Sequence, residues 1–462
     1  MTGVSKIEVV VKADKPERWG DIKRSPLSNL DKLMPPFHIW STLFYSYSVD
    51  RTKLERALSK TLSRYGELAG RIVIPANQTE PVVDLGNQGA LLTYLDPSAV
   101  SLKELEEKQF ENDFVFASFC ADDDEEDLEA NLGDSMSQCI DKAYLLRVRV
   151  QQLEGGGMVV GLGFHYQVCD INSMYVFTAD LCSMVRRNIF AFKESQLQVF
   201  RRCEIFKPDN SKVQSHPEFE IAKSEETQRK WEALIKDSVE NPRMNIRFQI
   251  SRKSLEAMKQ QVCSKHPNEV PVSTNDCVAS VLWRACVKGL RDAKPGDVSV
   301  FQLACNGRFR KKPPLPRTYF GNAMFIVYTS CHKEKLCKDS AYRTACRIRK
   351  SVLKVSEPYM QSVVNFVERE GADNVQFSSG HQPLDFSVTN WNQYFDWYKD
   401  GDMGSGRPRK ESVFLVASKH LAGMAIILPG EPDGVEILTG LTKEQFQIVL
   451  TDEYIKKYFT WC

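Results

Sequence analysis

The sequence lacks the features that mark several classes of protein. Its 462 residues carry 61 Lys and Arg against 60 Asp and Glu, so the formal net charge is only +1. Without an excess of one sign, neither a nucleic acid nor an anionic membrane surface is a natural partner. No apolar run approaches the roughly 18 residues of a membrane span, and residues 1–20 hold no stretch typical of a signal peptide. We expect a cytoplasmic globular protein of about two to three domains.

The cysteines show no pattern of a cross-link or a metal site. There are 13, an odd number, without a C-x-x-C pair. Most lie in apolar stretches, as Cys277, Cys286 and Cys305 do, which indicates reduced and mostly packed thiols. We therefore predict no metal centre. A G-x-S-x-G turn, which would activate a serine nucleophile, is also missing, so a covalent intermediate is not expected.

Strands and helices are predicted in both halves of the chain. Period-two alternation or short apolar runs predict strands at 6–13, 37–48, 66–74, 144–152, 244–251, 298–306 and 325–329, and a hairpin from 413–417 and 424–428. Helical spacing predicts helices at 50–65, 174–192, 225–238, 253–264, 341–355 and 443–450, and one that Thr274 or Asn275 caps. The acidic run at 121–129 is interpreted as a solvated loop.

The chain divides where periodicity is lost. Residues 203–224 gain Pro, Ser and charge, which predicts a crossover between one domain at 1–202 and another at 225–462. Neither half follows a strict alternation of strand, helix and strand. We therefore predict an α/β protein in which two mixed layers of sheet and helix lie side by side.

One stretch, Met158–Tyr175, has the pattern of a catalytic element. An apolar run with two glycines leads to His165, a polar turn contains Asp170, and an apolar helix follows. A strand, a turn and a helix in this order can direct an imidazole into a cleft, where a general base must reach a substrate hydroxyl. The simpler interpretation, a buried polar residue at the end of a strand, stays open at this point.

Five stretches in order resemble the BAHD family of acyl-CoA-dependent acyltransferases, in particular its hydroxycinnamoyltransferases. They are SPLSNLDKLMPPFHIWSTLFY (25–45), RYGELAGRI (64–72), NGRFRKKPPLPRTYFGNA (306–323), TNW (389–391) and DMGSGRP (402–408). The resemblance implies two chloramphenicol-acetyltransferase-like domains, with mixed sheets flanked by helices and a long crossover loop. It also implies an interdomain channel for acyl-CoA and a small alcohol or amine, and a monomer of secondary metabolism.

The chain departs from the family's catalytic H-x-x-x-D motif. Counting back from Asp170 without a gap puts Tyr166 in the place of the histidine, whereas one inserted residue keeps His165 as the base. Alternation along the strand puts Phe164 and Tyr166 on one face and Gly163 and His165 on the other. A β-bulge near the end of the strand can re-aim a side chain. Both alignments stay open.

The choice decides the chemistry. An imidazole with a pKa near 6.5 is substantially neutral at pH 7 and can accept a hydroxyl proton. A phenol with a pKa near 10 is only about 0.1% ionised at that pH and is a poor base. If Tyr166 fills the position, we expect a slow enzyme or none. His38, in a family-like block that lies near the acceptor in relatives, offers a third possible base.

The resemblance also implies roles for other residues. Asp170 is expected to face away from substrate and to pair with Arg308, because a buried carboxylate needs donors. Thr389 and Trp391 are expected beside the reacting carbonyl, where a hydroxyl and an indole N–H can donate to an oxyanion. A structural role is expected for Asp402, Gly404 and Gly406, although Met403 and Ser405 depart from the family pattern. Basic side chains that could meet the CoA phosphates are Arg310, Lys311, Lys312, Arg407 and Arg409.

We therefore hypothesise a cytoplasmic acyltransferase that needs no cofactor besides its acyl-CoA substrate. The acceptor would attack the thioester directly, with His165 as base. The alternative is an impaired protein on the same fold that binds an acyl thioester or a partner enzyme. A condensation-type domain of peptide synthesis ranks last, because the chain contains no carrier domain.

Overall fold

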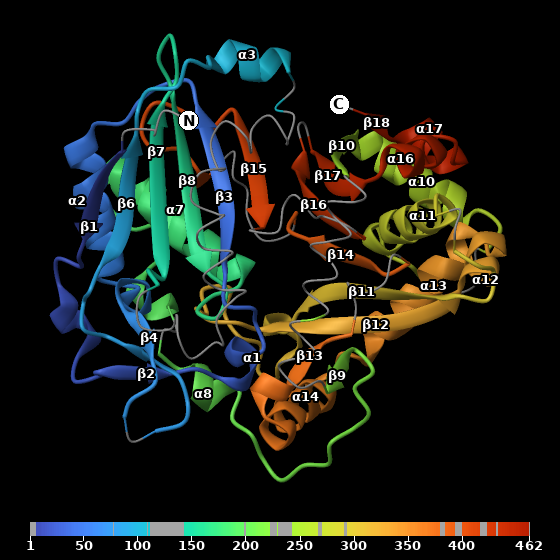
Figure 1. The fold of residues 1–462 in the computed structure, drawn as a ribbon, viewed down its shortest axis with the longest axis horizontal. Coiled ribbons are helices and arrows are strands. Elements are labelled where there is room, and N and C mark those ends of the chain that lie inside the picture. The colour runs from blue at the N-terminus through green and yellow to red at the C-terminus, as the bar shows by residue number, and fades with distance from the viewer. Residues whose placement is uncertain are drawn as a thin grey trace. The chain divides into compact units, whose positions relative to one another are not determined.

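The chain forms two compact units, shown in Figure 1. A computed structural model describes residues 6–76, 78–108, 110, 143–197, 200–221, 229, 243–266, 270–290, 293–378, 384–392, 400–415, 423–430 and 433–461. The first unit comprises Met1–Pro208, Pro314–Ala323 and Tyr394–Val416, and the second comprises Asp209–Pro313, Met324–Gln393 and Ala417–Cys462. The sequence predicted a single division, at 203–224. It did not predict that two later segments, Pro314–Ala323 and Tyr394–Val416, belong to the first unit.

A six-stranded mixed sheet forms the centre of the first unit. Its order is β1-β6-β7-β8-β3-β15, and β6 and β7 are its parallel pair. The strands are β1 (Lys6–Val11), β3 (His38–Tyr45), β6 (Ala90–Leu95), β7 (Leu146–Gln152), β8 (Met158–His165) and β15 (Lys410–Leu415). β15 comes from the second half of the chain and pairs with β3 along Lys410–Leu415. The last strand of this sheet is therefore supplied by a segment that returns from far along the sequence.

Every residue of β3 and β8 is buried, and helices cover one face of the sheet. The helices α2 (Arg51–Leu62) and α7 (Ile171–Arg187) pack against each other. α7 packs on the sheet through Phe177, whose ring centroid lies 5.5 Å from that of Phe164 (Figure 1). Period-two alternation sends Phe164 and Leu162 to this face. Gly163 and His165 therefore lie on the opposite face.

That opposite face explains a glycine of the central strand. Trp40 of β3 lies directly opposite Gly163 in the antiparallel register. A Cβ atom at Gly163 would come within 2.6 Å of the indole ring, which no side chain can tolerate without movement. The indole packs with Phe44, Leu105, Leu153 and Val159. Glycine is thus required where the tryptophan crosses the strand, next to His165.

Smaller elements complete the first unit. A three-stranded sheet has the order β2-β5-β4, and one short helix, α8, lies where the predicted crossover begins. These elements are η1 (Pro16–Trp19), β2 (Arg24–Pro26), α1 (Asn29–Lys32), η2 (Gly66–Ala69), β4 (Arg71–Val73), β5 (Val82–Asp84), α3 (Leu102–Glu107), η3 (Glu194–Gln196) and α8 (Arg202–Ile205).

The second unit has a seven-stranded mixed sheet of order β12-β11-β14-β16-β17-β10-β18. Its strands are β10 (Met244–Ile250), β11 (Val298–Asn306), β12 (Met324–His332), β14 (Phe386–Asn390), β16 (Met424–Gly430), β17 (Gly434–Leu441) and β18 (Thr460–Trp461). A separate pair is formed by β9 (Phe219–Ile221) and β13 (Val375–Phe377).

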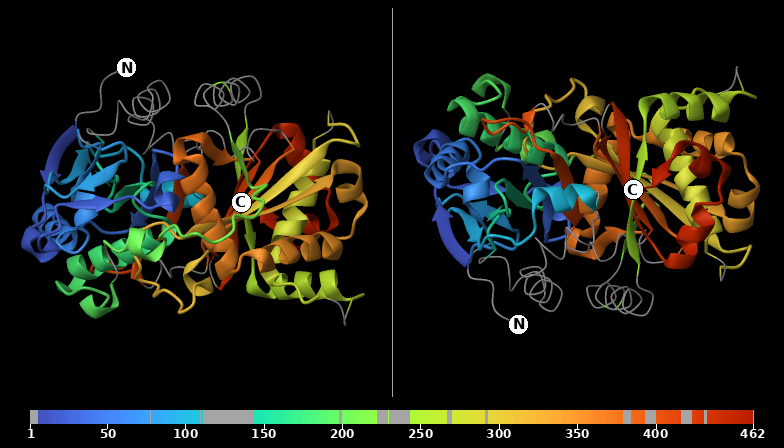
Figure 2. Two further views of the ribbon diagram at one scale, coloured as in Figure 1. Left: turned by 90° about the horizontal axis from the view of Figure 1, so that it is seen from below. Right: turned by 90° about the horizontal axis from the view of Figure 1, so that it is seen from above.

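Helices cover this second sheet as well (Figure 2). Trp283 of α11 lies 4.9 Å from Phe301 of β11 between ring centroids, and its indole N–H donates to Ser299. The helices of the unit are α10 (Arg252–Cys263), α11 (Thr274–Lys288), η4 (Arg308–Arg310), α12 (Lys333–Lys338), α13 (Ala341–Lys354), α14 (Glu357–Glu370), η5 (Ala372–Asn374), α16 (Lys443–Val449) and α17 (Glu453–Tyr458). The predicted α/β class, with mixed sheets flanked by helices in two domains, is confirmed.

Three local predictions are wrong. The strand predicted at 66–74 begins only at Arg71, because Gly66–Ala69 form the 3-10 helix η2. Residues 413–417 and 424–428 do not form a hairpin, because β15 pairs with β3 whereas β16 pairs with β14 and β17. The cap of α11 is Ser273 instead of Thr274 or Asn275, since its hydroxyl accepts from Asp276 N–H in a capping box. The acidic run at 121–129 lies outside the described residues, as does the predicted helix at 225–238 apart from Arg229.

Candidate active site

The turn after β8 is fixed by main-chain bonds on both sides of His165. β8 pairs one to one with β3 as far as His38 opposite His165, so the described strand contains no bulge that would re-aim the imidazole. Tyr166 N–H donates to Phe37 O at 2.9 Å, and Val168 N–H donates to His165 O at 3.0 Å. The sheet and the turn therefore determine the directions in which the side chains of His165 and Tyr166 point.

Asp170 begins helix α7 and is buried. One carboxylate oxygen accepts from the N–H and the hydroxyl of Ser173, each at 3.0 Å. The other oxygen accepts from Ala323 N–H at 3.0 Å. An N-terminal carboxylate cap also interacts favourably with the helix dipole. These bonds give Asp170 a positioning role, consistent with the expectation that it faces away from substrate. Arg308 belongs to the second unit, and its predicted pairing with Asp170 stays a prediction.

His165 is buried, with 5% of its surface exposed, and lies edge-on to His38 with ring centroids 5.4 Å apart. Burial, with a smaller contribution from Arg147, lowers the pKa of His165 to about 4. Its Nδ1 atom is buried and has no hydrogen-bond partner among the described residues. At neutral pH the ring is uncharged, and one nitrogen lacks a protein partner.

His38, the second candidate imidazole, is oriented by the backbone. Its Nε2 lies 2.7 Å from Tyr144 O, which identifies this nitrogen as the protonated one in the neutral ring. Burial lowers the pKa of His38 well below its ordinary value, and Arg147 and His165 lower it further. The structure thus brings together two of the three candidate bases, both neutral, across one strand pair.

Tyr166, the third candidate, is more exposed than either histidine. Its ring lies 6.3 Å from that of Phe37 between centroids. Burial raises the pKa of the phenol, and the nearby Asp170 raises it further. A phenol that is harder to ionise is a still weaker general base at neutral pH. In this environment Tyr166 can donate a hydrogen bond but has little capacity to accept a proton.

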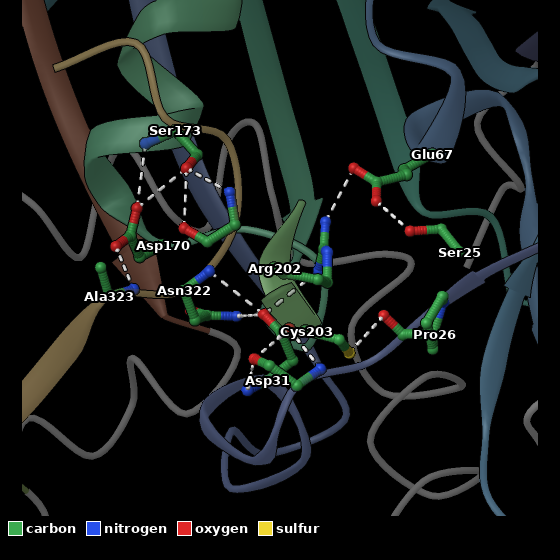
Figure 3. Close-up of polar contacts among 12 residues, drawn as sticks. Ser25, Pro26, Asp31, Glu67, Asp170, Ser173, Arg202, Cys203, Asn322 and Ala323 are labelled. Carbon is green, nitrogen blue, oxygen red and sulfur yellow. Dashed lines mark hydrogen bonds and ion pairs between the residues drawn. The ribbon is translucent and has the colours of Figure 1, made fainter. Parts of the chain in front are cut away.

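A buried ionic cluster beneath the turn was not predicted (Figure 3). Arg202 of α8 forms ion pairs with Asp31 at 3.1 Å and with Glu67 at 2.7 Å, and all three side chains are at most 1% exposed. Burial alone would lower the pKa of Arg202, but Asp31 and Glu67 outweigh it and raise that pKa. Ser25 donates to the other oxygen of Glu67 at 2.6 Å. The only sequence signal was the capping pattern of Ser28 and Asp31, which indicates a helix start and no ion pair.

Thr389 and Trp391 lie together in the second unit. The indole N–H of Trp391 donates to the hydroxyl of Thr389 at 2.8 Å, and Trp391 is buried. The indole therefore orients the hydroxyl, and only the proton of Thr389 is left to meet an oxyanion. This geometry changes the expectation that both groups donate to substrate. The position of Thr389 beside a reacting carbonyl stays a prediction.

The loop that contains Asp402 is organised by its carboxylate. One oxygen accepts from Gly404 N–H at 2.7 Å and Gly406 N–H at 3.1 Å, and the other pairs with Arg186 of α7 at 3.1 Å. Burial opposes the ionised form, yet these donors together lower the pKa of Asp402. Gly404 and Gly406 have φ values of +132° and +128°, which other residues rarely adopt. These bonds are those of a self-organised loop, and its structural role stays a prediction.

The basic residues expected at the CoA phosphates have partners of different kinds. Arg310 donates to Val352 O and Val355 O, so it closes the end of α13. Arg409 makes a double contact with Glu106 at 3.0 and 2.8 Å, and Lys311 lies 3.8 Å from Glu357. The described contacts of Arg310 are those of a helix cap. A role in CoA binding stays a prediction for this group, Lys312 and Arg407 included.

The described ranges show neither a metal site, nor a disulfide, nor a membrane-spanning helix. In these ranges, no group of three or more His, Cys, Asp and Glu side chains is placed to bind a metal ion. The described cysteines are all free. Each helix in the described part of the chain is too short or too polar to cross a bilayer.

The fold and the motifs have known counterparts. Residues 5–455 match the Transferase family. A tryptamine benzoyltransferase of Oryza sativa subsp. japonica is 24% identical over 92% of this chain and 91% of its own length. A baccatin III:3-amino-3-phenylpropanoyltransferase of Taxus cuspidata is 24% identical over 94% and 92%.

Solved structures show the same fold. The TRI101 protein of F. graminearum, in complex with coenzyme A and T-2 mycotoxin, matches with a TM-score of 0.77 and 15% identity over 95% of this chain and 99% of that one. Vinorine synthase matches with a TM-score of 0.66 and 17% identity over 96% of each chain. Since the family match spans almost the entire sequence, the chain belongs to the Transferase family, the acyltransferases called BAHD, and the class predicted from its motifs is confirmed.

Proposed function

We propose that this protein transfers an acyl group from a CoA thioester to a small alcohol or amine, with His165 as the general base. The observation that carries the proposal is the state of His165 at the end of β8. Its ring is neutral at physiological pH because burial lowers its pKa to about 4, and Nδ1 has no partner among the described residues. A neutral imidazole with an open nitrogen can accept the proton of an acceptor hydroxyl.

The reaction follows from these groups without a covalent enzyme intermediate. The acceptor O–H or N–H proton moves to the imidazole while its oxygen or nitrogen forms a bond to the thioester carbon. The carbonyl electrons move to oxygen, where hydrogen-bond donors stabilise an oxyanion. When the C–S bond breaks, the CoA thiolate takes the proton from the imidazolium. A buried imidazole with a low pKa is a weak base, so we expect slow turnover.

A second candidate function is favoured by one observation. Tyr166 stands four residues before Asp170, where the family has its histidine, and it is more exposed than His165. If the residue at that position decides activity, the chain is a binding protein for an acyl thioester or a partner enzyme. Its partly buried phenol would then occupy the place of the base.

Release of CoA thiol tests both candidates in one experiment. Wild type, His165→Ala, Tyr166→Phe and Tyr166→His are compared with benzoyl and hydroxycinnamoyl CoA and a panel of alcohols and amines, with acceptor-free reactions as the control. Loss of the base predicts a fall of about 10²–10⁴ in His165→Ala and little change in Tyr166→Phe. The proposal fails if Tyr166→Phe falls equally or His165→Ala keeps full rate. A silent wild type whose Tyr166→His variant gains turnover supports the second candidate.

The setting of the enzyme is part of the proposal. We propose a cytoplasmic monomer of secondary metabolism, supported by its balanced charge and by its family. Light scattering of the purified chain checks the oligomeric state, and a fluorescent fusion checks the compartment.

A further inference from the structure

Three consecutive residues of the first unit, 321–323, donate hydrogen bonds to the candidate catalytic turn and to the start of α7. They belong to Pro314–Ala323, the segment that returns to the first unit. Gly321 N–H donates to Ser173 Oγ at 3.0 Å, Asn322 Nδ2 donates to Tyr166 O at 2.8 Å, and Ala323 N–H donates to Asp170 at 3.0 Å. Figure 3 shows Asn322 and Ala323 between Asp170 and the ionic cluster of Arg202. Of the three, only Asn322 uses its side chain.

Asn322 is itself held by the ionic cluster. Its backbone N–H and its Nδ2 both donate to the same Asp31 oxygen, at 3.1 and 2.9 Å. That oxygen also pairs with Arg202 at 3.1 Å. Asn322 and Asp31 are completely buried. The two protons of Nδ2 thus have separate acceptors, Asp31 and Tyr166 O, and a flipped amide would set its oxygen against both. The orientation of this side chain is therefore determined.

The amide of Asn322 completes the anchoring of Tyr166. The N–H of Tyr166 is bound to Phe37 O, and its C=O is bound to Asn322 Nδ2. The first bond fixes the peptide before Tyr166 and the second fixes the peptide after it, so neither can rotate without breaking a hydrogen bond. Removing the amide of Asn322 takes a part-buried hydrogen bond from the Tyr166 carbonyl, a loss that proteins relieve by local rearrangement or by admitting water.

We infer that Asn322 is a positioning residue for the reaction. It connects the buried ionic cluster to the peptide that follows Tyr166 and so holds the turn that limits the movement of His165. The inference rests on the proposed function, since it assigns Asn322 to the base used there. Asn322 acts through the turn and makes no contact with substrate in this assignment. Misplacement of a reacting group by about 1 Å can cost roughly 100-fold in rate.

The test compares Asn322→Ala with Ser25→Ala. Ser25 is an equally buried member of the same cluster, but it donates only to Glu67, on the far side of Arg202. Positioning predicts that Asn322→Ala lowers kcat by about 10- to 100-fold, with KM for acyl-CoA changed less than about threefold. Ser25→Ala is expected to keep kcat within about twofold at a similar loss of Tm. If kcat falls in proportion to Tm in both variants, or stays unchanged in Asn322→Ala, the inference is wrong.

A second readout does not depend on activity. Histidine-labelled protein is titrated by NMR, with the His165 signal assigned through His165→Gln. Opening of the turn in Asn322→Ala is expected to move the pKa of His165 from about 4 toward 6.5, whereas Ser25→Ala leaves it unchanged. Identical titrations in the two variants would contradict the inference. If Asn322→Ala does not fold, Asn322→Leu, which has a similar shape and neither a donor nor a charge, gives the same comparison. An inactive wild type with the predicted NMR shift rejects the proposed function and retains the positioning role.

Discussion

Two buried histidines, one in each unit, differ in what their ring nitrogens contact. His165 at the end of β8 leaves Nδ1 without a partner among the described residues. His216 in the second unit has both nitrogens occupied, because Nδ1 lies 2.8 Å from Glu218 and Nε2 lies 2.8 Å from the hydroxyl of Ser362. Tyr359 also donates to Glu218, and Gln214 N–H donates to Ser362. The residue type is shared, and the surroundings are opposite.

The comparison shows that the types of residue in a cluster do not by themselves decide whether the cluster can react with a substrate. Ser362, His216 and Glu218 are the residue types of a nucleophile, a base and an orienting carboxylate, in hydrogen-bond sequence. All three are sealed from solvent, with the side chains of His216 and Glu218 at 0% and 1% exposure. A buried cluster whose members satisfy one another stabilises the fold. A buried imidazole whose nitrogen has no partner among the described residues keeps an acceptor for a substrate proton. We therefore propose a functional role for His165 and a structural role for His216.

The largest expected effects come from replacing each of the two histidines in turn. His165→Gln is expected to lower turnover by about 10²–10⁴, since it removes the general base. His216→Gln is expected to keep turnover but to lower the free energy of unfolding by about 1–3 kcal/mol, because Glu218 and Ser362 lose a buried partner. Steady-state kinetics and urea unfolding are measured on both variants. Equal losses of turnover at equal stability would remove the distinction between the two histidines.

Replacing Arg202 sharpens the comparison for charged groups. Arg202→Met keeps most of the side-chain volume but leaves Asp31 and Glu67 as buried carboxylates without their cation. Breaking a buried ion pair from one side typically costs about 3–5 kcal/mol. Urea unfolding measures the loss, and Arg409→Met, which breaks the exposed contact with Glu106, is the matched control with an expected loss below about 1 kcal/mol. Similar losses in the two variants would show that the cluster is not strongly coupled to folding.

The same contrast marks what sequence can predict. Local signals located most elements, including the strand at 158–165, because periodicity depends on which face of an element is buried. They missed the helix α14. They also joined 413–417 to 424–428 in a hairpin, because pairing between strands is decided by contacts between residues far apart in sequence. The roles of Asn322 and Arg202 were missed for the same reason. Asn322 meets Tyr166 and Asp31 across 156 and 291 residues, and no spacing rule connects them.

The pH dependence of stability sharpens the comparison at His165 itself. Its pKa is about 4 in the folded protein and about 6.5 when unfolded. Between these values the unfolded chain binds more protons than the folded protein. The contribution of His165 to the free energy of unfolding is therefore fully present above about pH 6.5 and is lost as the pH drops toward 4. The shift corresponds to about 3 kcal/mol at pH 4. We expect the free energy of unfolding, measured with urea, to fall over this window by about 3 kcal/mol more in wild type than in His165→Gln. His38 and Arg147, which face His165, are present in both proteins. Parallel pH curves would contradict an uncharged buried imidazole.

The smallest expected effect comes from the hydroxyl in the sealed cluster. Ser362→Ala removes the acceptor of Gln214 N–H and the partner of His216 Nε2 without changing charge. We expect a loss of about 1–2 kcal/mol in the free energy of unfolding, the usual cost of an unsatisfied buried group, and unchanged acyl transfer. Ser211→Ala, at a more exposed hydroxyl that accepts from Asn365, is the control. Because Ser362 is the residue that would attack if these three side chains formed a working triad, a loss of turnover far beyond the loss of stability would mean that the cluster opens to substrate. In that case the hydrogen-bond partners of the ring nitrogens in the folded state would not separate the two histidines, and the base would have to be sought at His216.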